Sequence, residues 1–125
     1  MRKEAVGTGR APLSLPFSPG IRLGNLLFVS GQGPVDQHGN VLPGDIKVHT
    51  RTTLENFRRI VESSGTTMDN VLQTTVYLRD LSDFQGMNEI YSSFFREPRP
   101  SRTTVQAGLL FGMLVEIQGI VYIPE

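Results

Sequence analysis

Apolar residues recur along this chain with two different spacings, and each spacing is typical of one kind of element. In residues 113–123 they alternate, which is the two-residue period of a β-strand. Val115, Ile117, Val121 and Ile123 fall on one face, and Leu114, Glu116, Gln118, Ile120 and Tyr122 on the other. Glu116 is an acid in an apolar strand, so it should be solvated, ion-paired, or held in a pocket that raises its pKa. Only the pocket would make it a general acid or base.

From about Ile46 to Ser64 the apolar spacing is three to four residues, which predicts a helix. Leu54, Phe57, Ile60 and Val61 form its apolar face. Gly65 stands where a C-terminal cap is expected.

A second helix is expected to begin at 82–85, where Ser82 and Gln85 have the spacing of a capping box. Its apolar stripe is Phe84, Met87, Ile90, Tyr91 and Phe94. Pro98 and Pro100 lie beyond its end. Phe17, Phe84 and Phe94 are most simply interpreted as core residues, and Asn88 and Tyr91 as residues at the packed edge of the helix.

Residues 21–31 predict two strands joined by a Gly-Asn turn at 24–25, and 71–80 and 101–107 predict further strands. The Gly- and Pro-rich segments are expected to be loops, namely 7–20, taken as ordered, and 33–45. The resulting order, β-β-α-β-α-β-β, predicts an α+β fold with both helices on one face of the sheet. The other face would be partly apolar and uncovered, which favours self-association.

Composition narrows the class of protein. The 125 residues suit a single domain, 1–125, and 12 basic residues balance 12 acidic ones. That balance argues against a general nucleic-acid-binding protein. The chain has no cysteine, which removes disulfides, zinc–thiolate sites and a thiol nucleophile. No stretch resembles a signal peptide or a membrane span, so a cytoplasmic protein without membrane contact is expected.

Arg102, in "PSRTTVQA", lies two residues before Thr104, so both would face the same side of a strand. Arginine suits carboxylate binding because its planar fork donates two parallel hydrogen bonds. If 101–107 and 113–123 formed a simple hairpin, Arg102 and Glu116 could instead be a cross-strand ion pair of little energetic value. Local spacing alone favours that structural interpretation.

Other candidate motifs are weaker. "VSGQGP", 29–34, lacks the Lys-Ser/Thr ending of a phosphate loop and indicates a tight turn where the backbone approaches a ligand or another chain. His38 and His49 match no metal motif and are expected at the surface. Ser30 has no nucleophile-elbow context.

Taken together, four stretches resemble the RidA/YjgF/UK114 family in their order and spacing, over nearly the whole chain. They are "GNLLFVSGQGPVD", the segment from "GDIKVHTRTTLENF" to "MNEIYSSFF", "PSRTTV" and "LVEIQGI". The resemblance implies a chorismate-mutase-like α+β fold, assembled as a homotrimer with sites between subunits. It also implies hydrolytic deamination of reactive 2-imino acids and enamines to 2-keto acids and ammonia, without metal or organic cofactor.

By the same resemblance, Arg102 would bind the substrate carboxylate and Glu116 would position and activate water. Ser30 and Gly31 would line the pocket, and Asn88 would lie at the cleft. Two positions depart from the best-known members, which often have tyrosine and cysteine where this chain has Phe17 and Thr104. Both would also line the substrate site. The loop 107–112 differs as well.

Three alternatives to this activity stay open. Thr104 and the "VYIPE" ending also resemble the 2-aminomuconate deaminase branch, which would imply a longer dicarboxylate enamine as substrate. The same Arg102 pocket could serve a non-catalytic trimer that binds a metabolite carboxylate. A role on RNA, attributed to some family members, fits poorly with zero net charge.

Overall fold

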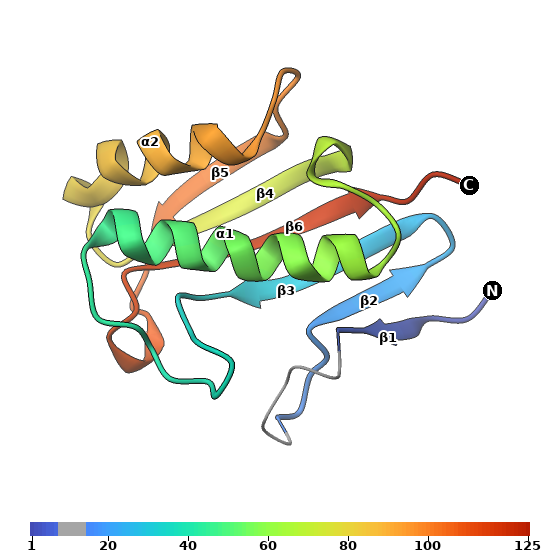
Figure 1. Ribbon diagram of the computed structural model, residues 1–125, viewed down its shortest axis with the longest axis horizontal. Coiled ribbons are helices and arrows are strands. Elements are labelled where there is room, and N and C mark those ends of the chain that lie inside the picture. Colours follow the sequence, from blue (N-terminus) through green and yellow to red (C-terminus); the bar gives the residue numbers. More distant parts are fainter. Residues whose placement is uncertain (8–14) are drawn as a thin grey trace.

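Within the residues described by this computed structural model, 1–7 and 15–125, six strands form one sheet in the order β1-β2-β3-β6-β4-β5 (Figure 1). The strands are β1 (Glu4–Val6), β2 (Gly20–Leu23), β3 (Leu26–Gln32), β4 (Val71–Leu78), β5 (Ser101–Gln106) and β6 (Val115–Tyr122). Only β4 and β5 run parallel; the other neighbours are antiparallel. Residues 8–14, the centre of the loop expected at 7–20, lie outside the described residues.

Two helices, α1 (Ile46–Ser63) and α2 (Phe84–Phe94), cover the same face of the sheet (Figure 1). The side chain of Asp45 caps α1 by accepting the amide hydrogen of Val48 at 3.0 Å. Gly65 follows the end of α1 with φ +84°, a conformation that glycine adopts without steric cost. The expected α+β class and the placement of both helices on one face are confirmed, and the observed order adds one strand, β1, before the expected ones.

The core lies between the helices and the sheet. Its fully buried members include Leu54, Phe57, Val61, Val76, Leu78, Val115, Ile117 and Val121. The alternation expected for β6 is confirmed, because Val115 and Ile117 are buried while Gln118 and Tyr122 are exposed. Among the described residues, no helix covers the opposite face of the sheet, which exposes Phe28, Val105 and Tyr122.

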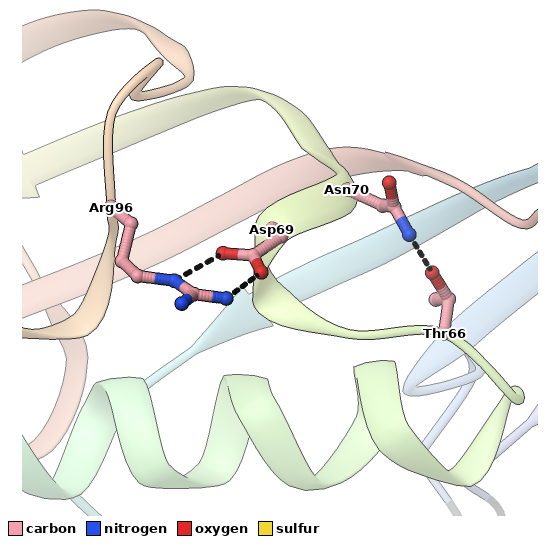
Figure 2. Close-up of polar contacts among 4 residues, drawn as sticks. All are labelled: Thr66, Asp69, Asn70 and Arg96. Carbon is pink, nitrogen blue, oxygen red and sulfur yellow. Dashed lines mark hydrogen bonds and ion pairs between the residues drawn. The ribbon is translucent and has the colours of Figure 1, made fainter.

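Polar contacts organise the segment between α1 and β4, and Figure 2 shows two of them, Thr66 with Asn70 and Asp69 with Arg96. The hydroxyl of Thr66 donates to the carbonyl oxygen of Tyr122 at 2.8 Å and accepts from the amide of Asn70 at 3.0 Å. Asp69 pairs with Arg96. The bond from Thr66 to Tyr122 fixes the chain that follows α1 against the end of β6, and the Asp69–Arg96 pair joins the turn before β4 to the chain that follows α2.

Several sequence-based expectations are wrong. Strand β1 was not expected, because three residues are too few to show a period. The expected capping box is absent, because no side chain caps α2. Asp80 instead accepts a hydrogen bond from the amide of Ser82 and caps the short 3-10 turn Leu81–Asp83 that precedes α2. Phe17 and Phe84 are not core residues, since they are 60% and 42% exposed. They lie on a loop and at the first position of α2.

Candidate functional site

Arg102 projects from the edge strand β5 toward α2. Its guanidinium carbon lies 4.7 Å from the ring centre of Tyr91 and 5.7 Å from that of Phe84. One nitrogen is 4.0 Å from the sulfur of Met87. These three residues share one stripe of α2 because their spacing of three to four residues matches the helical period. The cation therefore rests on two aromatic faces, which stabilise it by cation–π attraction.

Within residues 1–7 and 15–125, Arg102 has no carboxylate partner. The ion pairs found there join Lys47 to Glu89, Arg96 to Asp69 and Arg99 to Glu97. Apart from the weak contact with the Met87 sulfur, the donors of the half-buried guanidinium are available to another acceptor, and a carboxylate matches their geometry best.

Thr104 and Asn88, two further candidates from the sequence, lie on the same two elements as Arg102 and its aromatic contacts, β5 and α2. Asn88 follows Met87 on α2, and its Oδ1 is buried without a hydrogen-bond partner in the described structure. Thr104 is two residues from Arg102 on β5, faces the same side and is half-buried. We call Arg102, Thr104, Asn88, Phe84 and Tyr91 the Arg102 cluster.

Glu116 belongs to a different part of the sheet, where β3 and β6 lose regular pairing. Val29 pairs with Gly119 and Gln32 with Ile117, so Ser30 and Gly31 together stand opposite Gln118. This two-to-one arrangement is a β-bulge. Gly31 lies directly against Glu116, because a Cβ atom on Gly31 would be 2.2 Å from Glu116 Oε2. Glycine is needed here to make room for the carboxyl group.

Ser30 connects the bulge to the segment that carries Phe17. Its hydroxyl donates to the carbonyl oxygen of Ser18 at 2.6 Å, and its amide donates to that of Pro19 at 2.9 Å. The Ser30 hydroxyl therefore has a structural hydrogen bond to the backbone. Phe17, one residue before Ser18, projects largely into solvent. We call Glu116, Gly31, Ser30 and Phe17 the Glu116 cluster.

Burial raises the pKa of Glu116 above its ordinary value. The described residues offer this carboxylate neither an ion-pair partner nor a hydrogen-bond donor within range. Of the three environments considered from sequence, the one closest to the structure is a partly buried position that raises the pKa of the carboxyl group. A carboxyl group of that kind can exchange a proton nearer neutral pH than a solvated one.

The two clusters lie on opposite faces of the sheet within one chain. Arg102 aligns with Thr74, which is fully buried and exchanges a hydrogen bond of 2.6 Å with Tyr91 of α2. Glu116 aligns with Tyr77, three residues further along β4. An odd spacing on a strand reverses the face, so Arg102 faces the helices and Glu116 faces away from them. Strand β4 also separates β5 from β6.

The hairpin of 101–107 with 113–123 is therefore wrong, and the cross-strand ion pair that depended on it is absent. Strand β5 instead lies at the sheet edge beside β4, and β6 lies between β3 and β4. The sites implied by the resemblance lie between subunits, and within one chain Arg102 and Glu116 come from strands separated by β4.

His49 was expected at the surface but is 3% exposed. Both of its ring nitrogens lie within hydrogen-bond distance of the backbone, near Leu42 O and Leu114 N. The sequence did hold a signal, since His49 lies three residues after Ile46 and eight before Phe57, on the apolar face of α1. His38, in contrast, is exposed as expected. The described residues contain no group of three His, Asp or Glu side chains placed to hold a metal ion.

Comparisons with known proteins agree over the full length of the chain. The family model described as Endoribonuclease L-PSP matches residues 8–123. A RutC family protein of Pyrococcus abyssi is 42% identical over 125 residues, which cover 98% of this chain and 98% of that protein. The chloroplastic Reactive Intermediate Deaminase A of Arabidopsis thaliana is 37% identical over 123 residues, covering 96% of this chain and 66% of the relative.

Among solved structures, that of E. coli TdcF with bound serine is similar with a TM-score of 0.87 at 32% identity. The similarity covers 97% of this chain and 99% of the TdcF chain. In the part of the chain that the structure describes, no helix has the length and apolar character needed to cross a membrane.

Proposed function

Because this chain belongs to the RidA/YjgF/UK114 family, we propose that it hydrolyses small 2-imino acids and their enamine forms to 2-keto acids and ammonia. The resemblance found in the sequence and the α+β fold with two helices on one face of a mixed sheet are confirmed. A RidA-type function is supported for the family as a whole. The specific reaction is our proposal for this chain.

The observation that carries the proposal is a pair of unpartnered, half-buried charges. Among the described residues neither Arg102 nor Glu116 has an opposite charge within ion-pair distance. Burying a charge without a partner is unfavourable, so such groups concentrate at sites of binding and catalysis. The two groups match one kind of substrate. An unpaired arginine can bind its carboxylate, and an unpaired carboxylate can activate the water molecule that its hydrolysis requires.

Arg102 would bind the substrate carboxylate through two parallel hydrogen bonds. Serine, the ligand named for the TdcF structure, carries such a carboxylate, which supports a small carboxylate as ligand here. Asn88 would line the cleft from α2, while its Oδ1 is buried and unpaired within the described residues.

Glu116 would take a proton from water as the water oxygen adds to the C=N carbon. The imine nitrogen gains a proton, and a carbinolamine forms. Collapse of that intermediate breaks the C–N bond, releases ammonia and leaves the keto group. The raised pKa of Glu116 favours both accepting and returning the proton. Holding water and imine together supplies the rest of the acceleration.

Since the two clusters face opposite sides of one chain, we propose that a complete site takes Arg102 from one copy and Glu116 from another. The uncovered sheet face, with Phe28, Val105 and Tyr122 exposed, offers an apolar surface for self-association. In a closed ring, every copy buries this apolar surface against a neighbouring copy. The homotrimer implied by the resemblance is one such ring.

The test of activity generates 2-iminopropanoate in situ and follows its loss with and without the protein. Accelerated loss with stoichiometric ammonia supports the proposal. Tight binding of pyruvate without any acceleration, for this and several other imines, would overturn the deaminase assignment and favour a carboxylate-binding protein.

The shared site has its own test. Arg102→Ala and Glu116→Gln are each expected to be inactive, but mixing, unfolding and refolding them together should restore activity. Random assortment in a ring puts an intact Arg102 beside an intact Glu116 in about a quarter of the sites. A chain carrying both substitutions, mixed with either single variant, is the control and should restore nothing. No recovery in the first mixture would place both groups in one copy.

A further inference from the structure

Two polar side chains of α1 reach the backbone on both sides of the Glu116 cluster. The first is His49, which is almost completely buried. The amide of Leu114 donates to its Nδ1 at 3.2 Å, and its Nε2 lies 2.8 Å from the carbonyl oxygen of Leu42. Because Nδ1 accepts, the hydrogen of the neutral ring must be on Nε2, which then donates to Leu42. His49 therefore binds the backbone two residues before Glu116.

The second side chain is Asn56, seven residues and about two helical turns further along α1. Its amide group donates to the carbonyl oxygens of Gly33 at 2.9 Å and Val35 at 3.0 Å. Its Oδ1 accepts from Arg59 at 2.8 Å. Asn56 therefore binds the backbone two residues after Gly31, on the opposite strand from the contact of His49.

The two anchored segments also touch each other. A Cβ atom on Gly33 would lie 2.4 Å from the sulfur of Met113, so the end of β3 and the start of β6 are packed without space between them. Regular pairing of β3 with β6 ends at Gln32 and Ile117. Beyond that pair, α1 supplies the hydrogen bonds that the sheet ladder does not.

We propose that His49 and Asn56 are positioning residues that hold the bulge of β3 and the start of β6 together, so that the Glu116 carboxylate stays pressed against the Gly31 backbone. This inference rests on the proposed function only for its effect on catalysis. A shift of the carboxylate by about 1 Å lowers the rate of a positioned reaction by up to about a hundredfold.

The central variant is His49→Phe, which keeps a planar ring but removes both hydrogen-bonding nitrogens. His49→Gln is the conservative variant, since its amide retains one donor and one acceptor. Asn56→Asp tests the other contact by replacing donors with acceptors. Thr66→Val is the matched control, because it removes a part-buried hydrogen bond to the backbone of the same strand, β6, at the opposite end.

We expect His49→Phe to lower kcat at least about tenfold while KM changes by less than about threefold, because substrate affinity depends on Arg102. Asn56→Asp should act in the same direction. His49→Gln should stay within about threefold of the wild-type kcat. Thr66→Val should lower the melting temperature but leave kcat unchanged. We call the backbone contacts of His49 and Asn56 the clamp. If Thr66→Val and His49→Phe lower kcat equally, the clamp is only structural and the proposal fails.

Two further readouts do not depend on turnover. Carbon-13 NMR of the Glu116 carboxyl should show a pKa closer to the ordinary value in His49→Phe than in wild type, and no change in Thr66→Val. Nitrogen-15 NMR of wild-type His49 should show the hydrogen on Nε2. A hydrogen on Nδ1 would remove the bond from Leu114 and overturn the proposal even without any variant.

These readouts separate the two proposals. If wild type hydrolyses no imine but the Glu116 pKa responds to His49→Phe, the proposed function fails and the clamp stands. If imine is hydrolysed while neither the pKa nor kcat responds to His49→Phe, the clamp alone fails.

Discussion

The Arg102 and Glu116 clusters are built in opposite ways. Arg102 extends from an edge strand onto the side chains of one helix, so aromatic rings of α2 hold its charge. Glu116 lies in an interior strand against bare backbone, and polar groups of the other helix hold that backbone. Side-chain support leaves the cation adaptable, whereas backbone support fixes the carboxylate. A binding group tolerates adjustment, but a group that transfers a proton must be held within a few tenths of an ångström.

The largest effect expected from this difference is on Arg102→Ala. Losing both hydrogen bonds to a carboxylate should lower kcat/KM by roughly a thousandfold. Arg102→Lys, which keeps the charge but not the fork, should recover only part of that loss. Steady-state kinetics with 2-iminopropanoate and binding of pyruvate measure the two consequences. If Arg102→Ala lowers the melting temperature but not affinity, Arg102 serves the fold.

Glu116→Gln should lower kcat by about a hundredfold or more, with little change in pyruvate affinity, since proton transfer is lost and the shape is kept. The amide should also stabilise the fold. The pKa of Glu116 is raised in the folded state, so its contribution to stability is fully present below the unfolded pKa and is lost as pH rises through the folded pKa. The advantage of Glu116→Gln in thermal unfolding should therefore grow from pH 4 to pH 7. An advantage that shrinks over this range would contradict the burial of Glu116.

Gly31→Ala tests the backbone support directly. The added Cβ would overlap Glu116 Oε2, so the carboxylate must move or the bulge must open. We expect about a tenfold loss of kcat and about 1–3 kcal/mol of destabilisation. Gly65→Ala is a control in which a Cβ meets no atom within 4 Å, although its φ of +84° imposes strain. It should lose stability without losing turnover per folded molecule.

Phe84→Leu should give the smallest effect. It removes one of the two rings beneath Arg102 at a position that is partly exposed, so stability should change little. Loss of one cation–π contact is expected to raise KM by about two- to fivefold and to leave kcat unchanged. A change in kcat rather than KM would mean that the Arg102 cluster acts in the chemical step.

The sequence predicted elements well where one period ran long enough, as in β6 and α1. It could not order the strands, because a strand of alternating residues such as 101–107 can pair with any neighbour. The separation of Arg102 from Glu116 follows from that order, so it was beyond local reasoning. His49 was misjudged for a different reason, since a buried histidine depends on backbone partners at Leu42 and Leu114 that are distant in sequence. The resemblance to the family indicated which residues could form the site, but only the order of the strands shows on which face of the sheet each of them lies.

The extra residue in β3 makes the number of residues in this strand as important as their identity. Val29 and Gln32 are three apart, yet they pair with Gly119 and Ile117, which are two apart. A one-residue deletion between Val29 and Gln32 would restore an unbroken ladder and remove the bulge beside Glu116. An insertion would shift everything from Gln32 onward to the other phase of the pleat. Length variation in relatives should therefore be absorbed in loops, and engineered libraries should keep the number of residues between Val29 and Gln32 unchanged and keep Gly31.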